Sequence, residues 1–168
     1  MSGLPGNLFI EQYIENKLQL QNEFTLMYID IDNFKAYNDV YGFERGDLII
    51  KTLANIMASV VPPNEFIGHI GGDDFIAIIS SEHTPQICCH LMDEFNRRLY
   101  KFYDPSDLDR GYIVSKNRSN VEEAFPLLSL SVSCIVNRNY HSLYEISRKA
   151  SEVKKKCKQI IGNAYLIE

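Results

Sequence analysis

"GHIGGDDFIAII", residues 68–79, places two glycines and two adjacent aspartates between two apolar runs. A Gly-Gly pair can turn a hairpin without strain, because glycine adopts positive φ as readily as negative φ. We therefore expect two neighbouring antiparallel strands, Phe66 to Ile70 and Phe75 to Ile79. Asp73 and Asp74 are then either solvated residues at the tip of the hairpin or one half of a larger acidic site.

Composition narrows the class of protein. The chain has 168 residues, of which 45% are hydrophobic and 23% are charged, and we expect a single domain with a substantial core over residues 1–168. A net charge of −5 argues against nucleic-acid binding. No apolar run approaches the roughly 20 residues that membrane insertion requires. The four cysteines fit neither a metal site nor a disulfide framework, which favours the reducing cytoplasm.

Outside the hairpin, the hydrophobic pattern changes between extended and helical segments. Further strands are expected at "FTLMYIDID" (24–32), "LLSLSVSCIV" (127–136) and "AYLIE" (164–168). Apolar residues at helical spacing predict helices over 10–18, 49–60, 87–102 and 143–157. The polar stretch 104–123 contains one extended piece, "GYIV". Strands and helices without strict alternation predict an α+β fold, in which helices flank a central, mostly antiparallel, five-stranded sheet.

A second acidic cluster lies in "YIDIDNFKAYNDVYGFERGD", residues 28–47. Asp30 and Asp32 occupy alternate positions of the expected strand and therefore point to the same face of the sheet. Ile29 and Ile31 then face the core.

The two acidic clusters can meet if this strand lies beside the Gly71–Gly72 hairpin. Asp30 and Asp73 would then lie close together, and neighbouring carboxylates repel each other unless a cation binds between them. Oxygen ligands of this kind suit Mg²⁺ or Mn²⁺. Glycines without side chains also let a polyphosphate approach the backbone N–H groups. The combination predicts a nucleotide-metal site.

These stretches resemble the GGDEF-domain diguanylate cyclase family. The signature stands here as "GGDDF" (71–75) and its companion as "DIDNFKAYNDVYGFERGD" (30–47), and "SGLPGN", "SLSVS" and "GNAYLI" match as well. The resemblance covers nearly the whole chain. It implies the nucleotidyl cyclase-like fold and a cytoplasmic enzyme of bacterial second-messenger signalling. Two GTP-loaded domains would form a transient homodimer and condense two GTP into cyclic di-GMP, with release of pyrophosphate.

Carried over position by position, the resemblance implies the site residues. Asp30 and Asp73 would bind Mg²⁺ (or Mn²⁺) together with the Ile31 carbonyl. Asp73 would also help to deprotonate the ribose 3′-OH that attacks the α-phosphate, and Asp74 completes the catalytic motif. The substrate-binding residues are Asn33, Phe34 and Lys35 for the β- and γ-phosphates, Asn38 and Asp47 for guanine, and Gly71, Gly72 and Lys158 for the approach and binding of phosphate.

Several of these residues have a plain structural alternative. Asp32 and Asp39 are interpreted as solvated or capping residues. Asn38 can form an Asx turn, and Lys158, within "KKKCK", can belong to a solvated helix face.

The chain also departs from the family pattern. Asp74 stands where active members usually have Glu, His69 replaces a common arginine, and Gly162 stands where many members have an arginine close to phosphate. These departures favour an alternative function, a catalytically weak or inactive GTP-binding domain that regulates attached domains. The segment 102–118 resembles the branch of the family joined to phosphodiesterase (EAL) or CBS modules, which implies a domain excised from a larger signalling protein.

Overall fold

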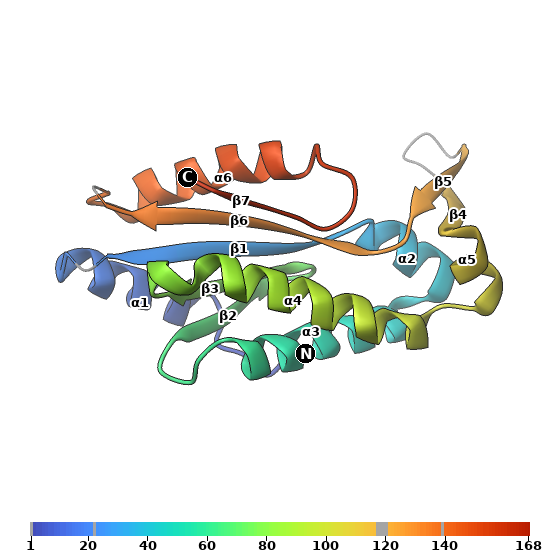
Figure 1. Cartoon of the computed structure of the whole chain (residues 1–168), viewed down its shortest axis with the longest axis horizontal. Helices are drawn as coiled ribbons and strands as arrows, with labels where there is room; N and C mark the ends of the chain where they lie inside the picture. Colours follow the sequence, from blue (N-terminus) through green and yellow to red (C-terminus); the bar gives the residue numbers. More distant parts are fainter. Residues whose placement is uncertain (1, 22, 117–120, 139) are drawn as a thin grey trace.

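The computed structural model describes residues 2–21, 23–116, 121–138 and 140–168. Its centre is a five-stranded sheet in the order β2-β3-β1-β6-β7 (Figure 1). Neighbouring strands are antiparallel except for β6 and β7, which are parallel. This confirms the expected α+β fold with a mostly antiparallel, five-stranded sheet. The strands are β1 (Phe24–Asp32), β2 (Phe66–Gly71), β3 (Asp74–Ile79), β6 (Ser129–Asn137) and β7 (Ala164–Ile167).

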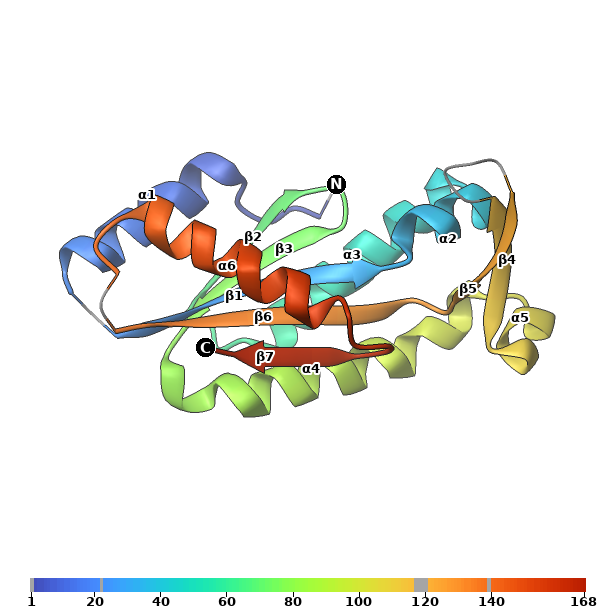
Figure 2. The ribbon, with the colours of Figure 1, turned by 90° about the horizontal axis from the view of Figure 1, so that it is seen from above.

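Helices cover both faces of the sheet (Figures 1 and 2). On one face, α3 (Phe43–Val60) and α4 (Thr84–Leu99) bury the larger apolar cluster. On the other, α1 (Asn7–Gln19) and α6 (Leu143–Cys157) bury a second cluster. Within the described ranges, no helix has the length and hydropathy needed to cross a membrane.

The side chains of β1 alternate between these two faces, as the period of a strand requires. Ile29 and Ile31 are buried in the cluster under α3 and α4, as expected. Leu26 belongs to the opposite cluster, under α1 and α6. Asp30 therefore projects toward the α6 side of the sheet.

The segment after β1 forms two helices where the sequence predicted one. Asn33, with φ of 62°, begins α2 (Phe34–Tyr41), and Gly42, with φ of 84°, separates α2 from α3. The expected helix start at Ile49 was wrong, because α3 begins at Phe43. The eight residues of α2 are too few to show a helical period, and the first turn of α3 is largely exposed and carries no apolar stripe.

The polar stretch contains more structure than its sequence indicated. It forms α5 (Pro105–Arg110) and a separate two-stranded sheet of β4 (Tyr112–Lys116) and β5 (Glu122–Pro126). Residues 117–120 of this predicted segment lie outside the described residues. The hydroxyl of Tyr41 in α2 donates a hydrogen bond to Asp107 of α5. Tyr103, just before the polar stretch, packs edge-on against Tyr41 of α2, with ring centres 5.6 Å apart.

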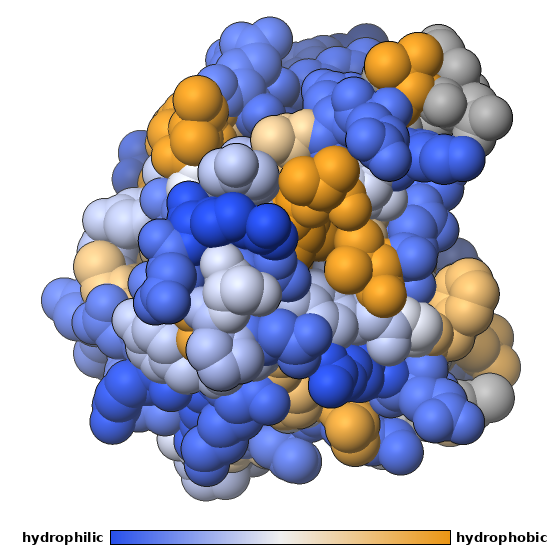
Figure 3. Space-filling view, turned by 90° about the vertical axis from the view of Figure 1, so that its right-hand side faces the viewer, coloured by the Kyte–Doolittle hydropathy of each residue, from blue (hydrophilic) through white to orange (hydrophobic). Residues whose placement is uncertain are grey.

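Figure 3 views this end of the molecule, where hydrophobic residues gather in separate clusters among hydrophilic ones. Short 3₁₀ turns at Ser81–His83 and Tyr100–Phe102 precede and follow α4.

Candidate active site

The Gly-Gly turn is held in place by His69. Gly71 and Gly72 both have positive φ, at 153° and 57°, and a β-bulge precedes the turn. His69 Nε2–H donates to the Gly72 carbonyl at 3.0 Å, and Ser2 Oγ–H donates to His69 Nδ1 at 2.9 Å. The imidazole also stacks on Phe75, with ring centres 4.3 Å apart. The tip of the hairpin is therefore anchored to the segment that precedes α1.

Three carboxylates meet where β1 and β3 run side by side. Asp30 and Asp74 are direct partners in the antiparallel register. The backbone carbonyl of Asp73, the residue before Asp74, accepts a hydrogen bond from the backbone N–H of Ile31, at 3.3 Å. The Asp30 side chain is 4% exposed, whereas Asp74 is 35% exposed. The expected adjacency of the first strand and the hairpin is thus confirmed.

Lys154 and Lys158 of the α6 region bring two ammonium groups to these carboxylates. Lys154 Nζ lies 2.8 Å from Asp30 Oδ2 and also donates a hydrogen bond to Asp74 Oδ1. Lys158 Nζ lies 2.5 Å from Asp30 Oδ1, although its side chain is 41% exposed. Lys158 is therefore not merely part of a solvated helix face, because it forms an ion pair with Asp30.

Burial and charge shift the protonation of these groups in opposite directions. Burial raises the pKa of the Asp30 carboxyl, but the hydrogen bonds from Lys154 and Lys158 outweigh it, and the pKa lies below its ordinary value. Burial and the negative charge of Asp30 raise the pKa of Asp73. Burial raises the pKa of Asp74 too, and Lys154 opposes this only in part. Burial lowers the pKa of Lys154, but both carboxylates raise it above its ordinary value.

The donor atoms at this centre are oxygens, which a divalent cation such as Mg²⁺ prefers. Asp30 Oδ1 is buried and lies 2.5 Å from the Lys158 ammonium, which a cation bound at this oxygen would displace. Asp73 adds a second carboxylate beside it. Among the described residues, no group of three or more His, Cys, Asp and Glu side chains is arranged to hold a metal ion. A cation here would therefore need ligands beyond acidic side chains, such as a backbone carbonyl and the oxygens of a bound phosphate.

Next to the carboxylates, Asn33 and the first turn of α2 border two pockets. One pocket, of about 320 Å³, has Asp32, Asn33, Lys158 and Gly162 in its lining. Gly162 leaves it open, because a Cβ built there would meet no described atom within 4 Å. The second, of about 230 Å³, is lined by two lysines and two acids, together with Asn33; they are Lys35, Lys116, Asp39 and Glu123. The N-terminus of α2 faces this region with backbone N–H groups that have no helical partner.

The two residues expected to read guanine lie on α2 and α3. Asn38 packs against Gly46, where an added Cβ would stand 1.9 Å from Asn38 Oδ1. That oxygen is buried and has no hydrogen-bond partner among the residues described. Asp47, the neighbour of Gly46, is exposed. The Asx turn that was the structural alternative for Asn38 is therefore absent within the described ranges.

Sequence reasoning missed the part that Ser129, Ser131 and Lys154 play in this centre. Asp32 is not simply solvated, because Ser129 and Ser131 of β6 each donate to its carboxylate at 2.9 Å. The alternate spacing of these serines in "SLSVS" is the signal that places them on one face of a strand. Lys154 was missed as well, although it precedes Lys158 by one helical turn and so shares its face.

Comparisons with known proteins show which sequences this chain is similar to. DgcZ, a diguanylate cyclase of Escherichia coli, is 29% identical over 153 residues, which are 86% of this chain and 48% of DgcZ. A diguanylate cyclase of Vibrio cholerae is 31% identical over 91 residues, which are 53% of this chain and 28% of that protein. The chain thus spans half or less of the length of these relatives.

Solved structures show the same fold. The GGDEF domain of YfiN (TpbB) from Pseudomonas aeruginosa superposes with a TM-score of 0.73 at 15% identity, covering 99% of this chain and 98% of that one. The GGDEF domain of DgcB from Caulobacter crescentus gives a TM-score of 0.63 at 20% identity, covering 99% and 92%. The family model described as "Diguanylate cyclase, GGDEF domain" matches residues 1–163. This chain belongs to the GGDEF-domain diguanylate cyclase family.

Proposed function

We propose that this domain condenses two molecules of GTP into cyclic di-GMP and releases pyrophosphate. The observation that carries the proposal is the meeting of Asp30, Asp73 and Asp74 at the adjoining ends of β1 and β3. Family membership gives the reaction class. The paired carboxylates and the neighbouring lysines supply the charges that transfer of a nucleotidyl group needs.

The triphosphate would lie between the first turn of α2 and the Gly-Gly turn. Asn33 and Phe34 would offer backbone N–H groups, and Lys35 and Lys158 would offer ammonium groups. Gly71 and Gly72 project no side chain into this space, so the phosphates can approach the backbone. The two pockets beside Asn33 support this placement.

Guanine would be read by Asn38 and Asp47. The unsatisfied, buried Asn38 Oδ1 can accept a hydrogen bond from a base. Asp47 can accept from the N1–H and N2–H of guanine together, a donor pair that adenine lacks. The Cβ-free Gly46 between them leaves room for the Asn38 side chain.

The reaction needs a 3′-oxygen on one GTP and an α-phosphate on the other. Asp73 would accept the 3′-OH proton, and its carboxyl pKa, raised by burial and by Asp30, supports this role. A Mg²⁺ or Mn²⁺ ion held by Asp30, Asp73 and the Ile31 carbonyl would neutralise phosphate charge. One domain binds one GTP, so product formation requires a transient homodimer.

A second candidate, a GTP-binding regulatory domain, is favoured by two observations. Asp74 is engaged by Lys154, and Gly162 contributes no side chain to the phosphate pocket. Such a domain would bind GTP and control attached modules, such as phosphodiesterase or CBS domains, in a cytoplasmic signalling protein.

Product analysis separates the two candidates. The domain is incubated at high concentration with GTP and Mg²⁺, and cyclic di-GMP is measured by chromatography. The cyclase predicts product whose formation per molecule rises with protein concentration, because two domains must meet. GTP binding by calorimetry without any product would instead identify the regulatory domain, and absence of GTP binding would exclude both.

A further inference from the structure

We propose that Lys154 is a built-in cation of the acidic centre, which holds Asp74 against Asp30 and limits the centre to one divalent ion. The inference rests on the proposed function, since it concerns the same carboxylates. It assigns Lys154 a positioning role, because the ammonium acts on the ligand carboxylates rather than on the reacting atoms.

The first argument is the place of the ammonium. Lys154 bridges two strands, with Nζ 2.8 Å from Asp30 Oδ2 and in hydrogen-bond contact with Asp74 Oδ1. These two carboxylates are register partners on adjacent antiparallel strands. A second metal ion would have to bridge the same pair, because two-metal sites share carboxylate ligands between ions about 3.5–4 Å apart. The ammonium already occupies that bridging position.

The second argument is the balance of charge. Asp30, Asp32, Asp73 and Asp74 bring four negative charges, and Lys154 and Lys158 bring two positive charges. The cluster is therefore left with two net negative charges, which a single divalent cation neutralises. A second divalent ion would meet a centre that is already neutral, and it would have to displace a tethered ammonium.

The third argument is that Lys154 differs from its neighbours on α6. Its side chain is 27% exposed, and it follows Val153, one of the buried residues that face the sheet. Lys155 is exposed, and Lys156 pairs instead with Glu168 at the end of the chain. Lys158 contacts Asp30 at its other oxygen. Within the described residues, Lys154 alone is ion-paired to two carboxylates of the centre.

Counting bound Mn²⁺ by electron paramagnetic resonance tests the proposal. The domain is titrated with Mn²⁺, first without nucleotide and then with the α,β-methylene analogue of GTP, which cannot release pyrophosphate. Wild type should bind one Mn²⁺ per domain with the analogue, and Lys154→Met should bind two. Without nucleotide, Lys154→Met should bind Mn²⁺ at least about tenfold more tightly, because the competing ammonium is gone. Lys155→Met, on the same helix, should behave as wild type.

Two results would overturn the proposal: two Mn²⁺ ions per wild-type domain, or identical Mn²⁺ binding by wild type and Lys154→Met. Circular dichroism checks that the variant folds, and Lys154→Gln replaces it if it does not. If the GTP analogue does not bind, the proposed function in GTP condensation is contradicted. The nucleotide-free comparison would still decide the role of Lys154, so the two failures are distinguishable.

Discussion

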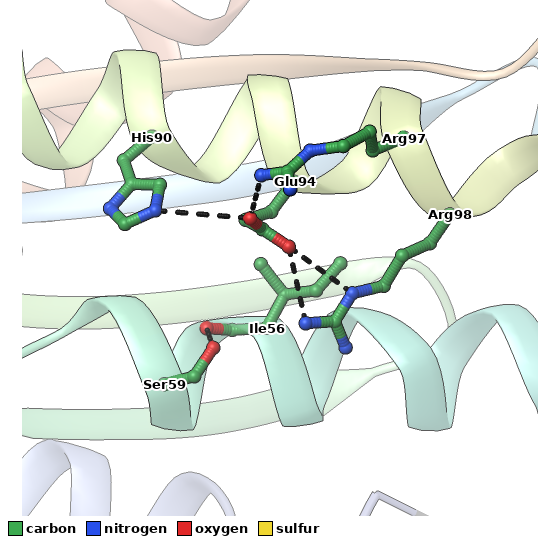
Figure 4. A network of polar contacts seen from close by, with 6 residues as sticks. All are labelled: Ile56, Ser59, His90, Glu94, Arg97 and Arg98. Carbon is green, nitrogen blue, oxygen red and sulfur yellow. Dashed lines mark hydrogen bonds and ion pairs between the residues drawn. The ribbon is translucent and has the colours of Figure 1, made fainter.

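Two clusters of charged side chains lie in different parts of this molecule. Around Glu94, the side chains of His90, Arg97 and Arg98 gather on the outside of α4, above α3 (Figure 4). Arg98 lies 3.2 Å and His90 3.9 Å from the Glu94 carboxylate. Around Asp30, by contrast, the partners come from β3 and α6.

The difference between the clusters is where their members come from. The partners of Glu94 are three or four residues away on the same helix, which is the spacing at which any helix brings side chains together. Asp30 is 4% exposed, and the fold must bring a second strand and a helix to it. Like charges placed side by side cost stability, so their assembly from distant segments indicates a function. A high density of charged side chains does not by itself indicate a function.

The sharpest test of this comparison removes one acid from each cluster. Asp73→Ala should lower cyclic di-GMP formation by roughly a thousandfold or more, because a metal ligand and proton acceptor is lost. Glu94→Ala should leave the rate unchanged. Chromatography of the product measures both variants, and circular dichroism confirms their folding. Product from Asp73→Ala within tenfold of wild type would remove Asp73 from the mechanism.

A second test asks whether an exposed acid can carry specificity. Asp47 is as solvent-accessible as an ordinary surface acid, but it follows Gly46, which packs against Asn38. Wild type should prefer GTP to ATP by roughly two orders of magnitude, because adenine leaves Asp47 without a donor pair. Asp47→Ser should lose most of this preference, since a hydroxyl can serve either base. Calorimetry with both nucleotides measures it, and equal binding of ATP and GTP by wild type contradicts the assignment.

The fold was largely predictable because strand and helix periods are local properties of the sequence. The hairpin around Gly71, the strand 24–32 and the last helix were all expected within a few residues of their observed bounds. The helix α2 was not expected, because it is short and depends on the left-handed Asn33 and on packing of Tyr37. The strand β5 was not expected, because it is short, largely exposed and begins with two glutamates.

The candidate site was predictable only in part, for a physical reason. Alternation placed Asp30 on the face opposite Ile29, and the glycines marked the turn before Asp73. No local pattern says which helix covers that face, so the ion pair of Lys154 with Asp74 required the packed structure. The same holds for the two β6 serines that hydrogen-bond Asp32.

A third test compares the stability that each cluster supplies. Asp30→Ala should lower the free energy of unfolding by about 2 kcal/mol, since it leaves two lysines around an emptied, buried position. The lysines are partly exposed and can regain water, which keeps the loss below that of a fully buried pair. Glu94→Ala should lose at most about 1 kcal/mol. Urea denaturation measures both, and equal losses would erase the distinction between the clusters.

The smallest expected effect separates two acids within the centre itself. The pKa of Asp73 is raised by burial and by Asp30, whereas the pKa of Asp30 is lowered because its lysines outweigh burial. A raised carboxyl pKa means that ionised Asp73 destabilises the fold as pH rises above the unfolded value of 3.8. A lowered pKa means that Asp30 stabilises the fold above 3.8, and that this stabilisation is lost as pH falls through the lower, folded value.

Asparagine substitutions should therefore have opposite effects in metal-free buffer. At pH 7, Asp73→Asn should raise the free energy of unfolding by about 0.5 kcal/mol, a small gain because the side chain keeps contact with water. Asp30→Asn should lower it. The gain of Asp73→Asn should shrink as pH falls through the raised pKa and vanish below pH 3.8, where the carboxyl is neutral in both states. Urea midpoints measured from pH 3 to pH 7 give the profile. Destabilisation by Asp73→Asn at pH 7 would show that its charge is satisfied within the fold, and that the acids are not held under mutual repulsion.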